Sequence, residues 1–137
     1  ESLCEKARIK AGKPFTDEDF LAKLEIVLNS GIKKIKIYLI LGLPGDKEDA
    51  DRQDKLWSDM LKLAKSRGGR FHFSVNPLIP MPFTPMEKLR MMNKNEIKKA
   101  YKAFKTRFSG ADIRFESVND AIRGHRLAFS REDLLEN

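Results

Sequence analysis

Strand-like and helix-like segments alternate along this chain, which leaves few topologies open to it. The strand-like segments centre near Ile37, Phe73 and Arg114. These centres lie roughly 35 to 40 residues apart, the spacing of strands joined by crossover helices. Strands connected in this way run parallel, so the sequence predicts an α/β fold with a parallel sheet.

Helix boundaries are marked by capping residues and glycines. Thr16 precedes the carboxylate of Asp19 by three residues, a capping box that predicts a helix ending near Gly31. A second helix is predicted from the acidic stretch that starts at Asp46 to the basic residues that end at Arg67. A third helix is predicted from Asn95 to residue 108. The tail, residues 118–135, is predicted to be helical with a break near residue 124.

The strands differ in how cleanly their side chains alternate. Apolar residues fall on both parities of Lys33 to Leu41, which predicts a strand covered on both faces. Arg70 to Asn76 alternates strictly, and Ile113 and Phe115 mark a short third strand. The four prolines of residues 77–85 predict an exposed or site-lining loop.

This pattern is that of alternating strand-helix units, about half of a partial (β/α) barrel similar to the TIM barrel. A complete eight-unit barrel needs about 250 residues, whereas this chain has 137 and three or four units. An open doubly wound sheet is the competing architecture. We expect residues 1–137 to form one unit that is a fragment of a longer protein, because the first residue is Glu1 rather than Met.

Composition limits the environment and the partners. No apolar run approaches the roughly 18 residues that a membrane span needs. The single cysteine, Cys4, excludes an internal disulfide and fits a reducing, cytoplasmic setting. The formal net charge of +7 permits a polyanionic partner without requiring one.

Strand parity selects the polar side chains that could form a site. If Phe73 packs against helices, His72, Ser74 and Asn76 face the other way, which is the interior in a barrel. The same parity groups ionisable residues of the third strand as candidates for contacting a substrate: Asp112, Arg114 and Glu116. The alternative is an edge strand with one solvated face.

Three other features allow a functional and a structural interpretation. The turn from Gly42 to Gly45 could bring backbone amides to a ligand or could simply connect two elements. Cys4 lacks an assigned base, which favours an unreactive thiol. The lysines at positions 94, 98, 102 and 105 form a stripe that is either a solvated helix face or a nucleic-acid contact.

Four segments resemble radical S-adenosylmethionine (radical SAM) enzymes, in the subgroup often described as cobalamin-binding. A strand running into Gly42-Leu43-Pro44-Gly45-Asp46 is one, and the strand and Pro-rich loop of residues 74–85 are another. Residues 12–19 and 128–131 resemble further segments in the same order. The resemblance implies the carboxyl-terminal half of a (β/α)₆ barrel, with S-adenosylmethionine across the carboxyl ends of the strands. Residues that it places beside this cofactor are Ile40, Gly42, Pro44, Gly45, Ser74, Val75 and Asn76.

The family motif CxxxCxxC, whose three thiolates hold a [4Fe–4S] cluster, is absent from this chain. The resemblance therefore implies that the cluster is bound by an amino-terminal half of the same parent chain, and that the fragment alone is inactive. Cobalamin is a further cofactor that the subgroup's name suggests. A half barrel exposes two strand edges, so we also expect self-association. Two rival functions remain, a basic nucleic-acid-binding module and a small α/β scaffold that binds a phosphate or nucleotide at Gly42 to Gly45.

Overall fold

A computed structural model describes the backbone of residues 1–135 and the side chains of residues 1–130. Arg131, the last residue of one segment of resemblance, lies outside the described side chains. The elements, in chain order, are α1 (Glu5–Lys10), α2 (Asp17–Asn29), β1 (Lys34–Leu41), α3 (Ala50–Ser66), β2 (Arg70–Pro77), α4 (Lys94–Arg107), β3 (Asp112–Phe115) and α5 (Val118–Leu135). The predicted order is confirmed from α2 onward, and only the six-residue α1 was missed.

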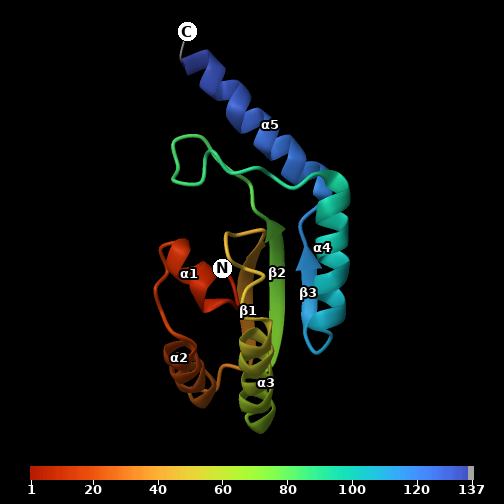
Figure 1. Ribbon diagram of the computed structural model, residues 1–137. Coiled ribbons are helices and arrows are strands. Elements are labelled where there is room, and N and C mark those ends of the chain that lie inside the picture. The colour runs from red at the N-terminus through yellow and green to blue at the C-terminus, as the bar shows by residue number, and fades with distance from the viewer. Residues whose placement is uncertain (136–137) are drawn as a thin grey trace.

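The three strands form one parallel sheet in the order β1-β2-β3. β1 pairs with β2 from Lys34↔Arg70 to Leu41↔Pro77, and β2 pairs with β3 from His72↔Asp112 to Val75↔Phe115. Figure 1 shows the strands side by side with their carboxyl ends at the top. The predicted α/β class with a parallel sheet is therefore confirmed.

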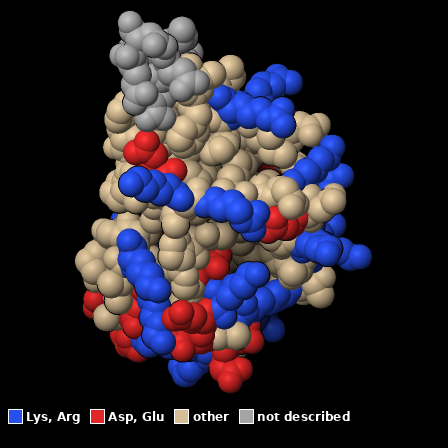
Figure 2. Space-filling model, turned by 45° about the horizontal axis from the view of Figure 1, so that its top comes forward, with Lys and Arg blue, Asp and Glu red and all other residues tan. Residues whose placement is uncertain are grey.

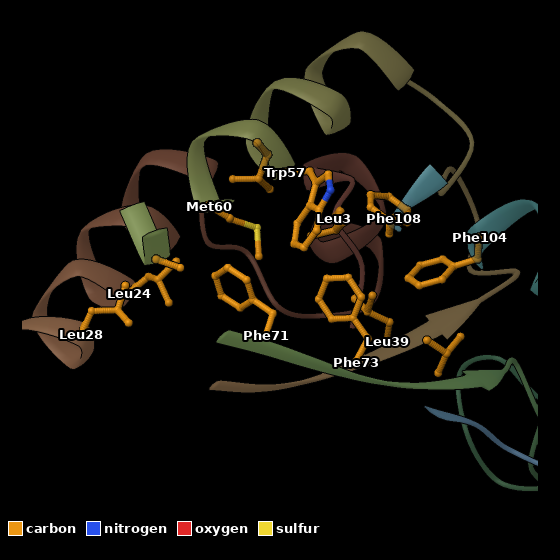
Figure 3. Packing of buried hydrophobic residues seen from close by; sticks show 13 residues of the cluster. Leu3, Leu24, Leu28, Leu39, Trp57, Met60, Phe71, Phe73, Phe104 and Phe108 are labelled. Atoms are coloured by element: carbon orange, nitrogen blue, oxygen red, sulfur yellow. The ribbon is translucent and has the colours of Figure 1, made fainter. Parts of the chain in front are cut away.

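Helices α2, α3 and α4 pack on one face of the sheet and enclose the main core. Trp57 and Met60 of α3 point toward Phe71 and Phe73 of β2, as Figure 3 shows. The ring centroid of Trp57 lies 5.2 Å from that of Phe73, and Phe104 of α4 lies 5.7 Å from the same ring. The sheet residues of this core share one parity, as the alternation in β2 predicted.

The opposite parity forms a face that we call the open face: Lys34, Lys36, Tyr38, Ile40, Arg70, His72, Ser74, Asn76, Asp112, Arg114 and Glu116. The prediction that β1 is covered on both faces is wrong, because the side chain of Tyr38 on this face is 61% exposed. Only Ile40, near the carboxyl end, is packed there, against a small cluster that includes Cys4 and Leu78. Helices α2, α3 and α4 lie on the other side, whereas Ala7 of α1 belongs to the small cluster around Ile40.

Two helix predictions need correction. α3 begins at Ala50 rather than near Asp46, because the acidic stretch continues the turn as far as Asp49, whose φ is +52°. α5 is continuous from Val118 to Leu135, without the predicted break at Gly124. An exposed glycine costs a helix only about 1 kcal/mol, which neighbouring contacts such as the buried Ala121 offset. The predicted cap at Thr16 is confirmed, since its side chain accepts from the Asp19 amide at 3.0 Å.

No helix within residues 1–135 combines the length and the apolar character needed to cross a bilayer.

Candidate functional site

Hydrogen bonds made by the side chains of Asp46 and Gln53 hold the turn after β1 in place. Gly42 and Gly45 adopt φ values of +96° and +82°, which residues with a Cβ rarely adopt. The Gly42 amide donates to Asp46 Oδ2 at 2.7 Å. Gln53 Nε2 donates to the carbonyls of Asp46 and Glu48 at 2.8 and 2.7 Å. The Gly42 amide is thus already paired with a carboxylate, so it is not free for an anionic ligand.

Cys4 anchors this turn to the amino-terminal segment. Its side chain is buried, and Sγ lies 3.2 Å from the Gly45 carbonyl oxygen and 3.5 Å from that of Glu48, as a hydrogen-bond donor to both. The thiol is therefore enclosed and bonded to backbone carbonyls. This geometry agrees with the structural interpretation of Cys4.

Of the residues predicted to contact the cofactor, three meet on the open face. Ile40 is the register partner of Asn76, and Ser74 lies two residues earlier on the same face of β2. Val75 points the other way and is fully buried among the helices, while its carbonyl accepts from the Glu116 amide at 3.0 Å. Val75 therefore offers only its backbone to the open face, where the side chains of Ile40, Ser74 and Asn76 lie.

The remaining predicted residues lie in the turn, and part of it borders a cleft. The cleft has a volume of about 510 Å³ and is lined by Ile40, Gly42 and residues from β1, the turn and α4. Pro44 and Gly45 are half-buried and do not line it. Met92 lies close to the exposed Gly42, since a Cβ added there would meet Met92 Cε at 3.3 Å. The sequence carried no signal for the α4 wall, because the placement of α4 over the end of β1 is a tertiary feature.

One acidic residue of the cleft, Glu96 of α4, is paired with an arginine of the preceding loop. Both guanidinium nitrogens Nη1 and Nη2 of Arg90 donate to the Glu96 carboxylate, at 2.9 and 2.8 Å. Together with the Asn93 amide, these bonds lower the pKa of Glu96 to about 2. Glu96 also completes a capping box with Asn93, so its role here is to start α4.

The three predicted substrate residues of β3 lie on or directly after the open-face side of that strand. Asp112 Oδ2 is 3.4 Å from His72 Nδ1 on the neighbouring strand. Arg114 is exposed. Glu116 follows the end of the strand, and its Oε2 is buried without a hydrogen-bond donor among the described residues. Burial first, and the charge of Asp120 second, raise the pKa of the Glu116 carboxyl.

A buried ionic network that sequence reasoning missed supports the start of the chain. Arg8 donates from Nη2 to Asp17 Oδ1 at 2.5 Å and from Nη1 to the Ser2 carbonyl at 3.2 Å. Arg52 of α3 donates to Asp17 Oδ2 at 3.0 Å and lies 2.7 Å from Glu5 Oε2. Every charge in this network is paired, so we assign it a structural role.

The described residues contain no group of three or more His, Cys, Asp or Glu side chains that could hold a metal ion. Cys4 does not fit a cluster site, because it is the only cysteine and it is buried against carbonyls. The predicted cluster ligands therefore cannot come from the described part of this chain.

Comparison with known proteins gives one relative and no family. An uncharacterized protein of Methanocaldococcus jannaschii is 28% identical over 136 residues, which are 98% of this chain and 30% of that relative. The chain thus spans less than a third of the length of the curated relative that it matches. No protein-family model matches the chain, and no solved structure matches it.

Proposed function

We propose that this chain is the carboxyl-terminal part of the catalytic barrel of a radical SAM iron–sulfur enzyme, and that the complete enzyme cleaves S-adenosylmethionine reductively to begin radical chemistry. The observation that carries the proposal is the difference in polarity between the two faces of the sheet. Its helix-covered face is apolar, and its other face carries the polar residues on which the resemblance also depends. In a (β/α) barrel the first face packs against the outer helices and the second lines the interior.

The winding of the chain supports a barrel wall over an open doubly wound sheet. A doubly wound sheet reverses its strand order and so carries helices on both faces. The described strands follow chain order, and both crossover helices, α3 and α4, pack on the same face. Successive right-handed crossovers in one direction produce this arrangement, which continues naturally into a barrel.

The outer edge of β1 suggests where the rest of the barrel would attach. The Ile40 amide donates to the Glu1 carbonyl at 2.8 Å, so the first residue runs beside β1. Figure 1 places the amino terminus beside β1, on the side away from β2. We therefore expect a preceding strand, from the amino-terminal half of the parent, to pair with β1. The isolated chain is expected to self-associate through its strand edges, and a stable monomer in light scattering would contradict this.

The cofactor would lie at the carboxyl end of the open face. Ile40 offers partly exposed apolar surface against which an adenine can stack, and the exposed Asn76 amide can both donate and accept hydrogen bonds beside it. These side chains fit an adenosyl group, and their role would be to bind and orient it. S-adenosylmethionine would supply the radical, with electrons from a cluster held outside this chain. Cobalamin has no support beyond the subgroup's name, so we do not include it.

The first test is to read the sequence encoded before Glu1. A CxxxCxxC motif within about a hundred residues, the length of the missing half barrel, is expected. A start codon directly before Glu1 would refute the proposal and favour a self-contained binding scaffold.

The second test uses the complete protein with its cluster reconstituted without oxygen. The wild-type protein should release 5′-deoxyadenosine from S-adenosylmethionine when a reductant is added. Asn76→Ala should weaken S-adenosylmethionine binding, whereas Asn95→Ala on the exposed start of α4 should leave it unchanged. Equal binding by the two variants would remove Asn76 from the site.

The two rival functions have less support. The Asp46 carboxylate, already bonded to the Gly42 amide, would repel a phosphate at the turn. The lysines of the α4 stripe are all exposed, as nucleic-acid binding requires, but exposure is equally what a solvated face shows. In Figure 2 the basic residues are spread out, with acidic and uncharged residues between them. Binding to RNA that weakens steeply with added salt would favour this rival.

A further inference from the structure

Beyond the Lys34–Arg70 pair at its amino end, the open face is crossed by three rows of register partners. The first of these rows contains Lys36, His72 and Asp112. The middle row contains Tyr38, Ser74 and Arg114. The third pairs Ile40 with Asn76, and Glu116 follows at the end of β3. Neighbouring strands in a sheet lie about 4.8 Å apart, so one small ligand can contact all three residues of a row.

The charges of this face are unbalanced. Its cations are Lys34, Lys36, Arg70 and Arg114, and its carboxylates are Asp112 and Glu116, an excess of two positive charges without counting His72. Within the described side chains, none of the four cations belongs to an ion pair. The Lys36 ammonium instead lies 5.0 Å from the centre of the Tyr38 ring. Elsewhere on the surface Arg67, Arg90 and Arg107 pair with carboxylates, whereas Arg123 and Arg126 of α5 belong to no ion pair among the described side chains.

We propose that the middle of the open face binds an anionic group of the substrate, a phosphate or a carboxylate, with Arg114 as its main ligand. The proposal rests on the proposed function, in which this face lines the barrel beneath S-adenosylmethionine. A guanidinium presents two parallel N–H donors that match the oxygens of either anion. The Ser74 hydroxyl and the Lys36 ammonium, from the adjacent strands, supply the next donors.

The three candidate residues of β3 then have different roles. Asp112 faces His72 rather than the ligand, at 3.4 Å between Oδ2 and Nδ1. Glu116 follows the carboxyl end of β3, and its Oε2 is buried rather than turned to a ligand. Of the three, Arg114 is therefore the residue that attracts the anion. Closure of the barrel would remove water from this face and strengthen the contact.

The experiment is a titration of the isotopically labelled chain with inorganic phosphate at constant ionic strength, followed by amide NMR. Shift changes should concentrate at the middle row, on β2 and β3. Arg114→Gln should weaken phosphate binding at least about tenfold, the effect of losing a charged hydrogen bond. Arg123→Gln, which removes the same charge from an exposed position on α5, should change it little. Arg114→Lys keeps the charge and should restore part of the affinity.

The outcomes separate this inference from its alternatives. Equal weakening by Arg114→Gln and Arg123→Gln, or shift changes spread over the lysines of α4, would overturn it. Binding of an oligonucleotide without binding of phosphate would also overturn it. A parallel titration with acetate identifies the anion, since tighter phosphate binding indicates a phosphorylated substrate and tighter acetate binding a carboxylate.

The inference and the proposed function can fail separately. In the complete protein, Arg114→Gln should retain S-adenosylmethionine binding, because Arg114 lies one row away from Ile40 and Asn76. Phosphate binding without S-adenosylmethionine binding would refute only the proposed function. S-adenosylmethionine binding without any anion binding at Arg114 would refute only the inference.

Discussion

The buried pair of Arg8 and Asp17 should contribute more to stability than any exposed ion pair of this chain. The side chain of Arg8 is 2% exposed and that of Asp17 is 9% exposed. Arg8→Met keeps the apolar stem but removes the guanidinium, which bonds to Asp17 and to the carbonyls of Ser2 and Phe15. Breaking a buried pair on one side costs about 3–5 kcal/mol, because the other charge loses its partner.

The structure places the expected cost near the lower end of that range. Asp17 keeps a second cation, Arg52, whose Nε lies 3.0 Å from Oδ2, so we expect Arg8→Met to lower the free energy of unfolding by about 3 kcal/mol. Lys55→Met is the matched control. Lys55 is 77% exposed and pairs with Asp59 at 2.8 Å within one helix, so this variant should cost less than about 0.5 kcal/mol.

The assay is urea unfolding followed by the fluorescence of Trp57, the only tryptophan, which packs from α3 onto β2. The slope of unfolding free energy against urea should stay constant while the midpoint falls. A double-mutant cycle with Asp17→Asn should give a coupling energy of at least about 1 kcal/mol. If Arg8→Met unfolds within about 1 kcal/mol of Lys55→Met, the assignment of a stabilising buried pair is refuted.

Three further predictions follow from single positions. Phe73→Ala should cost about 3–5 kcal/mol in urea unfolding, because Phe73 is 1% exposed among three aromatic rings, whereas the exposed Tyr38→Ala should stay within about 0.5 kcal/mol of wild type. Gly45→Ala should lower the melting temperature, because Gly45 has a φ of +82° and an added Cβ would lie 3.2 Å from Lys10 Nζ. Gly124→Ala should raise the melting temperature, because Gly124 lies within α5 and an added Cβ would meet no atom within 4 Å. Burial, and then the charge of Glu116, raise the pKa of Tyr101 to about 12. The neutral phenol therefore stabilises the fold fully below about pH 10, the pKa in the unfolded chain, and this contribution is lost as the pH rises toward 12. In an alkaline absorbance titration, Tyr101→Phe should abolish the ionisation step near pH 12.

Local patterns predicted the sheet and most helix boundaries because these depend on neighbours in sequence. The alternation of Arg70 to Asn76 assigned each side chain of β2 to the correct face, since side chains in a strand alternate by geometry. The hydroxyl of Thr16 capped α2 as expected, because a cap needs only the next three residues.

Features that depend on distant partners could not be predicted in this way. Asp17 looked like an ordinary first-turn acid of α2, yet its carboxylate pairs with Arg8 and Arg52 from two other helices. The same limit explains the error at β1. Ile40 and Tyr38 share a parity, but only Ile40 is packed, because the segment that starts at Glu1 lies beside that end of the strand.

The contrast between the two faces of the sheet also identifies the groups that have no partner among the described residues. The phenylalanines of β2 and β3 face the helices, where the other described residues of the core enclose them. On the other face the cations remain unpaired and Glu116 buries an oxygen without a donor. A sheet face with unpaired ionisable groups is stable only when it is solvated or when partners complete it. The described chain leaves it solvated, and a closed barrel with a bound anion would provide the partners that Arg114 and Lys36 lack.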